Sequence, residues 1–136
     1  MAIPSIGGGR QIGDGNVNEI SLGIQSTPAT ATSTATLTVA QLLTGLILGS
    51  PGSSAATYTL PTVALLEAAL GNAKVDSSFD FSVINVDGSG SGVITLAVGT
   101  GWTIVGLATV AATAGTAQMF RARKTGTGTW TLYRIG

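Results

Sequence analysis

The sequence predicts a mainly β domain, either a β-sandwich or a jelly-roll-like barrel, with one short α-helix and an extended N-terminal arm. Short runs rich in threonine, valine and isoleucine alternate with glycine-rich turns along most of the chain, which predicts seven to nine strands. One segment has the apolar spacing and the end signals of an α-helix. The first part of the chain has neither pattern.

The N-terminal part, residues 1–33, differs in composition from the β domain that we predict over residues 34–136. It has glycines every few residues and no helical period. Ile20, Leu22 and Ile24 alternate with small residues like one short strand. A disordered leader is one interpretation, but disordered segments are normally poor in branched aliphatic side chains. We therefore expect an extended arm that docks on another surface.

The clearest pattern lies in residues 78–98 and predicts a β-hairpin. Phe79, Phe81 and Val83 alternate with polar residues, as in a strand with one buried and one solvated face. The glycine-rich run 87–92 must reverse the chain, because its glycines adopt positive φ freely.

In the first strand of this predicted hairpin, the apolar residues of the second half lie on the other face. Ile84 and Val86 fall on the face opposite to Phe81, which predicts either a strand covered on both sides or a bulge. Further strands are predicted over residues 36–39, 46–48, 56–60, 102–105 and 107–110, with a helical turn over 40–45 and a second hairpin over 118–124 and 129–135.

The predicted helix begins at Thr62, which can cap it, and ends at Gly71, which can take the left-handed conformation. Leu66 and Leu70 lie one turn apart and should pack on a sheet. Glu67 is expected to face solvent.

The composition argues against several classes of function. A chain of 136 residues fits one domain, and its charged residues, 9% of the total, balance to zero. This balance gives no basic surface for nucleic acid, and a weakly charged surface tends to associate. The sequence contains no cysteine and no histidine, so it lacks the most common general base and the most common transition-metal ligand.

Candidate chemistry is sparse, and we predict no enzyme, no catalytic residue, no cofactor and no metal site. Asp80 and Asp87 flank one strand, too far apart for a glycosidase pair if the strand is extended. The loop 87–92 has one carboxylate, so a tight turn explains it better than a calcium site. The glycines of residues 7–13 lack the lysine and the flanking elements of a phosphate-binding loop.

Four basic residues gather near the C-terminus: Arg121, Arg123, Lys124 and Arg134. They suit a solvated hairpin edge that blocks unwanted strand pairing. Contact with an acidic protein surface is the alternative.

We expect neither secretion nor membrane insertion. The N-terminus has no positively charged region followed by an apolar run, and the weakly polar segment 105–117 is too short and too interrupted to cross a bilayer.

Several segments resemble small structural proteins of tailed bacteriophages, of cyanophage type, and in particular head decoration (cement) proteins. The similarity covers most of the chain and lies in Pro4-Ser-Ile-Gly-Gly-Gly-Arg-Gln-Ile-Gly-Asp-Gly-Asn16, Leu37-Thr-Val-Ala-Gln-Leu-Leu-Thr-Gly45, Thr57-Tyr-Thr-Leu-Pro61, Ser78-Phe-Asp-Phe-Ser-Val-Ile-Asn85 and Phe120-Arg-Ala-Arg-Lys-Thr-Gly-Thr-Gly-Thr-Trp-Thr-Leu-Tyr-Arg134.

The resemblance implies a virion protein that is made in the host cytoplasm, sits on the outer surface of the capsid, often as a homotrimer, and clamps the major capsid protein lattice. It implies no nucleic-acid and no membrane partner. A trimeric tail-fibre or receptor-binding module is the alternative, and would need an exposed aromatic groove. We assign capsid contact to the arm, at Ile3, Ile6, Arg10, Ile12, Ile20, Leu22 and Ile24.

Overall fold

A computed structural model describes residues 22–87 and 89–136, and in this part of the chain the strands form two sheets. The larger sheet contains β1 (Ala29–Ala31), β3 (Leu46–Gly49), β5 (Ser78–Asn85), β7 (Trp102–Val105), β9 (Thr116–Gly126) and β10 (Thr129–Arg134). The smaller sheet contains β2 (Ala35–Thr36), β4 (Ala56–Thr59), β6 (Ile94–Ala97) and β8 (Thr109–Val110). The predicted mainly β class is confirmed.

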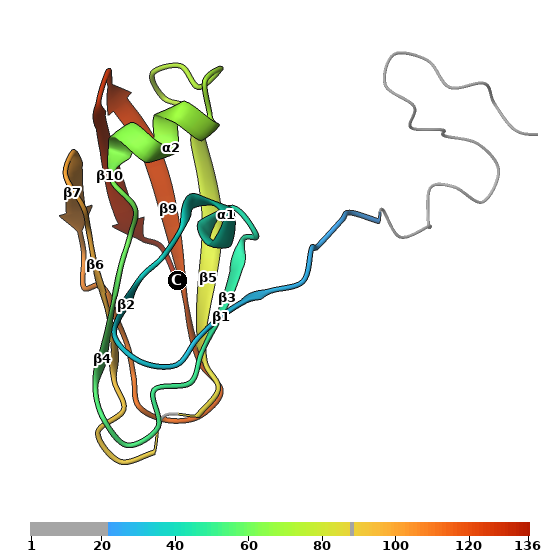
Figure 1. Cartoon of the computed structure of the whole chain (residues 1–136), viewed down its shortest axis with the longest axis vertical. Helices are drawn as coiled ribbons and strands as arrows, with labels where there is room; N and C mark the ends of the chain where they lie inside the picture. Colours follow the sequence, from blue (N-terminus) through green and yellow to red (C-terminus); the bar gives the residue numbers. More distant parts are fainter. Residues whose placement is uncertain (1–21, 88) are drawn as a thin grey trace, which may run out of the picture.

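The chain coils between the two sheets, because successive strands from β1 to β9 alternate between them (Figure 1). The strand order is β1-β3-β5-β9-β10-β7 in the larger sheet and β2-β4-β6-β8 in the smaller one. Five of the eight pairings between described strands are parallel. Jelly rolls are built from antiparallel strands, so this connectivity differs from the predicted jelly-roll alternative.

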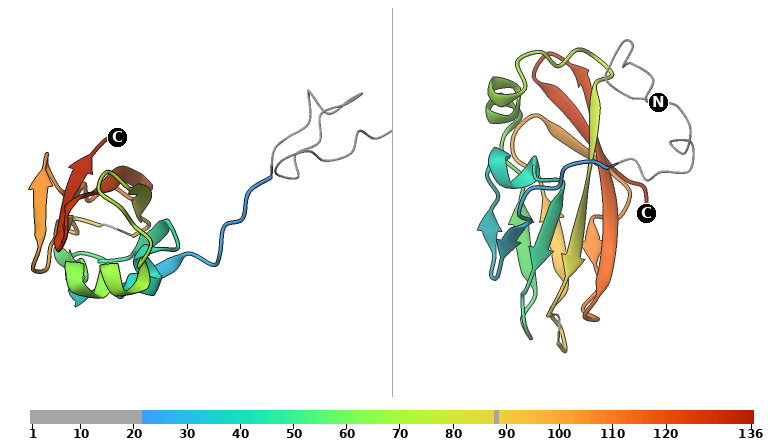
Figure 2. Two further views of the ribbon diagram at one scale, coloured as in Figure 1. Left: turned by 90° about the horizontal axis from the view of Figure 1, so that it is seen from above. Right: turned by 90° about the vertical axis from the view of Figure 1, so that its right-hand side faces the viewer.

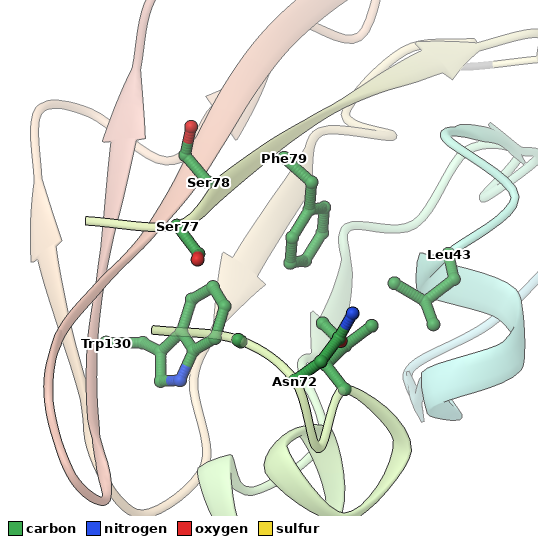
Figure 3. Close-up of a pocket in the computed structure, with 8 residues that line it drawn as sticks. Leu43, Asn72, Ser77, Ser78, Phe79 and Trp130 are labelled. Atoms are coloured by element: carbon green, nitrogen blue, oxygen red, sulfur yellow. The ribbon is translucent and has the colours of Figure 1, made fainter. Parts of the chain in front are cut away.

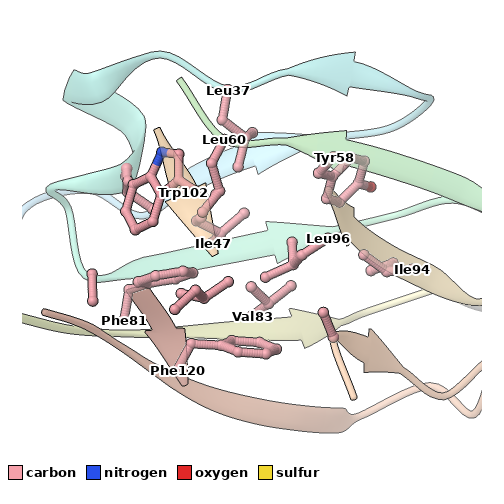
Figure 4. Close-up of a cluster of buried hydrophobic side chains, with 14 of the residues drawn as sticks. Leu37, Ile47, Tyr58, Leu60, Phe81, Val83, Ile94, Leu96, Trp102 and Phe120 are labelled. Atoms are coloured by element: carbon pink, nitrogen blue, oxygen red, sulfur yellow. The ribbon is translucent and has the colours of Figure 1, made fainter. Parts of the chain in front are cut away.

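The core lies between the sheets and takes side chains from both (Figure 4). Ile47, Phe81 and Phe120 enter it from the larger sheet, and Tyr58 and Ile94 enter it from the smaller one. None of these five side chains is more than 1% exposed. The rings of Phe81 and Phe120 stack with centroids 5.6 Å apart.

The predicted hairpin over residues 78–98 is wrong. β5 pairs with β3 and β9, whereas β6 belongs to the smaller sheet and pairs with β4 and β8. The glycine-rich segment does reverse the chain, but it carries the chain from one sheet to the other. Apolar residues of β5 and β6 therefore face each other across the core, which the same sequence alternation allows.

The predicted change of facing within β5 is also wrong. Phe81, Val83 and Asn85 are all buried, so one face points inward to the end of the strand. Ile84 is half-buried on the outer face, and Val86, which is 46% exposed, lies beyond the strand. The strand contains neither a bulge nor a second covered face.

The second hairpin is confirmed: β9 and β10 pair antiparallel around a turn in which Gly128 has a φ of 73°. Two other predictions need new boundaries. The strand expected over residues 36–39 ends at Thr36, because Thr38 caps the following helix. β1 lies inside the range 1–33 that we assigned to the arm, yet it pairs with β3. The described part of the arm is therefore residues 22–28.

Two helices connect strands toward one end of the sheets (Figure 1). The sequence predicts one helix and one helical turn in these positions. α1 (Val39–Leu42) begins with a capping box between Thr38 and Gln41, and Gly45, with a φ of 77°, follows it. α2 (Val63–Ala69) is capped by Thr62 as predicted. The predicted left-handed stop at Gly71 is absent, since its φ is not positive. We call α1, α2 and the residues next to them the helical end.

Candidate functional site

α2 has two apolar faces. Its inner face buries Val63 and Leu66 in the core. Its outer face presents Ala64, Leu65 and Ala68 to solvent, and Leu65 is 59% exposed. A helix on a monomer surface usually carries polar or charged residues on its outer face. The outer face of α2 therefore has the character of a contact surface.

An apolar groove lies beside this face. It has a volume of about 490 Å³ and is lined by residues 36–39 and 59–62 together with Leu65 and Gly99. Leu37 and Leu60 are buried, and Leu65 is the most exposed large side chain of the lining. No lining residue carries a charge. An uncharged recess with a buried apolar floor suits an apolar side chain from another segment.

Glu67 does not face solvent as predicted. Its carboxylate accepts a hydrogen bond from the Gly128 N–H at 2.9 Å and lies 3.2 Å from the Lys124 Nζ, and its side chain is 19% exposed. The Gly128 hydrogen bond, with a further contribution from Lys124, holds the Glu67 pKa below its ordinary value. The contact ties α2 to the β9–β10 turn.

A second, smaller cavity of about 220 Å³ lies between the two helices and the start of β5 (Figure 3). Phe79, Trp130, Leu43 and Asn72 surround it, and Ser77 points toward it. The Trp130 Nε1 is buried and has no hydrogen-bond partner among the described residues. Because Trp130 is only 1% exposed, its ring offers no open face for stacking.

The aromatic residues do not form an exposed groove in the described part of the chain. Tyr58, Trp102 and Trp130 are at most 9% exposed. Trp102 donates from Nε1 to the Pro61 carbonyl at 2.8 Å, which fixes the start of α2 to β7. Tyr133 is half-buried on the outer face of the larger sheet and accepts a hydrogen bond from Arg123 at 3.1 Å.

The basic residues near the C-terminus are paired within the chain. Arg121 makes two hydrogen bonds to Asp80, at 2.7 and 3.0 Å, and these bonds hold the Asp80 pKa below its ordinary value. Arg123 binds Asp76 at 2.7 Å.

The structure changes both interpretations of the basic residues near the C-terminus, as a protected sheet edge and as a surface that binds an acidic protein. β9 and β10 lie inside the larger sheet, so the hairpin is not a sheet edge that needs protection. Three of the four basic groups already have a carboxylate partner, which leaves little free positive charge for an acidic protein surface.

The predicted capsid-contact residues fall mostly outside the described part of the chain. Leu22 and Ile24 are described, and they are 88% and 101% exposed. They lie on the segment 22–28, which leaves the body next to α1 and extends away from both sheets (Figures 1 and 2). Gln25 anchors this segment through a 2.8 Å hydrogen bond from its Nε2 to the Thr44 carbonyl.

Capsid contact at Leu22 and Ile24 stays a prediction, and the sequence did not predict the groove. The run Ala64-Leu65 followed by Ala68 is the one sequence signal that could have indicated a second apolar face on this helix. The groove itself joins segments far apart in the sequence.

In the described ranges, no group of three or more acidic, histidine or cysteine side chains is placed to hold a metal ion. No helix in these ranges is long and apolar enough to cross a membrane. Comparison of the chain with protein-family models, curated proteins and solved structures finds no match.

Proposed function

We propose that this chain is a tailed-bacteriophage capsid decoration (cement) protein, which binds the outer surface of the head and stabilises the major capsid protein lattice. The observation that carries the proposal is the segment 22–28, in which Leu22 and Ile24 are 88% and 101% exposed and extend away from a well-packed β domain. Two such side chains on an extended segment expose apolar area that a protein partner would bury. The resemblance of the opening and closing segments to phage head proteins points to the same class.

The weakly charged surface also supports binding to a repetitive protein shell. The chain has no net charge. Six of its twelve charged residues form the ion pairs Arg121–Asp80, Arg123–Asp76 and Lys124–Glu67. Apolar and backbone contacts therefore have to supply the affinity. One arm would bind weakly, because ordering costs offset most of the gain from burial. Several arms on one oligomer bind together, and avidity can then exceed single-arm affinity by about a hundredfold.

The arm's role can be tested with a truncation that spares the domain. Deleting residues 1–24 removes all seven assigned contact residues, including exposed Leu22 and Ile24, but keeps the Gln25 anchor and β1. We expect circular dichroism and melting to stay unchanged, because every contact described in the domain remains. Binding to capsid shells that lack the protein, measured by co-sedimentation, should fall to background.

Full-length chain is the matched control, and it should decorate the same shells to saturation. If the truncated chain decorates them equally well, the arm is not the clamp and the helical end becomes the contact surface to test. If the full-length chain fails to bind shells, the proposed function is wrong. The alternative, a tail-fibre or receptor-binding module, then becomes the better hypothesis.

A further inference from the structure

We propose that the outer face of the larger sheet lies against the capsid, and that the outer face of the smaller sheet points to solvent. This inference rests on the proposed function and deepens it, because it names the surface of the domain that contacts the shell beside the arm. The partner that it requires is a broad, weakly charged and partly apolar surface of the shell protein.

The outer face of the larger sheet is apolar over one half. Side chains that point away from the core alternate with buried ones along β3, β5 and β9. Two neighbouring rows across these strands are apolar except at Ser82. We call the apolar residues of these rows the apolar face: Leu46, Leu48, Ile84, Ala117, Met119 and Ile135.

The register places these side chains next to one another. Leu48, Ile84 and Ala117 are consecutive partners across β3, β5 and β9. The adjacent row contains Met119, whose carbonyl accepts a hydrogen bond from the Ile135 N–H at 3.0 Å. Met119 is 44% exposed and Ile135 is 42% exposed. A sheet face that stays in water normally carries polar side chains, so this apolar face has the character of a protein contact.

The other half of the same sheet face carries charges that are already paired. Arg121 and Asp80 are partners across β9 and β5 and form an ion pair at 2.7 Å. Arg123 and Asp76 form another, also at 2.7 Å. Because both arginines have a carboxylate partner, this surface suits a weakly charged partner better than a strongly acidic or basic one.

The outer face of the smaller sheet has the opposite character, and we call it the threonine face. Thr57 and Thr59 alternate with buried residues along β4. Thr57 is aligned with Thr95, and Thr95 with Thr109, so three hydroxyl side chains form a row across β4, β6 and β8. A hydroxyl group both donates hydrogen bonds to water and accepts them from it. This face is therefore suited to stay hydrated.

The arm leaves the domain on the side of the apolar face. In Figure 1 the segment 22–28 departs on the side of β3 and β5, away from β4 and β6, and in the right-hand view of Figure 2 it crosses in front of β5. An arm that binds the shell therefore brings the apolar face toward that shell. This shared side selects the capsid as the partner, and two contacts on one body strengthen each other through effective concentration.

Single carboxylates placed on the two faces test this orientation. Met119→Glu and Thr95→Glu each add one charge at an exposed position of a strand. We expect Met119→Glu to weaken binding to capsid shells by about tenfold or more, because the contact would bury an unpaired carboxylate. Thr95→Glu is the matched control and should bind like the wild type. Circular dichroism and thermal melting of both variants verify the fold.

Thiol labelling locates the contact without relying on a loss of binding, because the chain contains no cysteine. Met119→Cys and Thr95→Cys each place one thiol, on the apolar face and on the threonine face. Both free chains should react with a maleimide, as measured by the mass of this chain. On decorated shells, we expect the thiol of Met119→Cys to be protected and that of Thr95→Cys to react as before.

Three results would overturn the orientation: Met119→Glu that binds like the wild type, unchanged labelling of Met119→Cys on fully decorated shells, or protection of Thr95→Cys there. Protection of Met119→Cys in the free chain would also overturn it, because a second copy or another part of the chain would then cover the face. All these results leave the proposed function standing when the wild type decorates shells. Failure of the wild type to bind shells would instead refute the proposed function, and the orientation with it.

Discussion

Phe81 holds the larger sheet to the core. It is 1% exposed, stacks on Phe120 and lies 6.3 Å, between ring centroids, from Phe79. Phe81→Ala removes most of this packing and leaves a cavity, so we expect it to lower the free energy of unfolding by about 3–5 kcal/mol. Phe79→Ala should cost less, because Phe79 is only half-buried. Denaturant melts of both variants compare the two losses of stability, and equal losses would contradict the smaller contribution that we assign to half-buried Phe79.

Gly101 is required for a close approach as well as for its backbone conformation. It has a φ of 97°, and a Cβ there would lie 2.7 Å from the Val63 Cβ and 2.8 Å from the Gly128 carbonyl oxygen. Gly128 has a φ of 73° but open space around its Cβ position. Gly128→Ala should therefore cost about 1–2 kcal/mol from backbone strain alone.

Gly101→Ala should cost about 1–3 kcal/mol more than Gly128→Ala, because overpacking adds to the strain. Thermal unfolding of the two variants isolates the steric part. Equal melting temperatures would mean that the β6–β7 connection can move away from α2.

At the residue scale, the sequence predicts which side chains are apolar and buried better than it predicts polar burial. Phe81 was placed correctly in the core by its alternation with polar neighbours. Asn85 was not, although it is fully buried and donates to the Gly92 and Ala111 carbonyls at 2.8 and 3.0 Å. These partners lie 7 and 26 residues away, and local periodicity carries no information about them.

The contact between α2 and the β9–β10 turn predicts a pH dependence. The Glu67 pKa is lowered in the folded protein, chiefly by the Gly128 N–H. This carboxylate therefore contributes stability that is fully present above its ordinary pKa of about 4.5 and is lost as pH falls through the lower folded value. Glu67→Gln should flatten this part of the stability profile below about pH 4.5.

Urea melts at a series of acidic pH values measure the effect. Asp87→Asn is the control for the loss of one carboxylate, since Asp87 is exposed in the loop after β5. A Glu67→Gln profile parallel to that of the wild type would show that the α2 contact does not depend on charge.

At the scale of elements, the sequence predicts positions more reliably than pairings. The helix at Thr62 and the β9–β10 hairpin follow from local end signals and were predicted. The connection between β5 and β6 was misassigned, because a glycine-rich turn reverses the chain equally well within one sheet or between two. Alternation buries one face of each strand in both cases, so only the long-range pairing with β3 and β4 distinguishes them.

At the scale of the whole molecule, the coiled path between the sheets explains how the helical end forms. β2 and β4 lead into α1 and α2, so both helix starts lie beside the groove. The sequence predicted an arm with exposed aliphatic residues, because its composition cannot build a core. It could not predict the groove, whose lining comes from three separate parts of the chain.

The central claim is that the chain sits on the outside of a phage head, and a cryo-electron microscopy reconstruction of the virion tests it most directly. The reconstruction should be compared with one of particles assembled without the chain. We predict that density fitting the two-sheet domain lies on the outer surface of the shell and is absent from the control particles. Density for this domain in the tail, or a head surface identical in the two reconstructions, would contradict the claim.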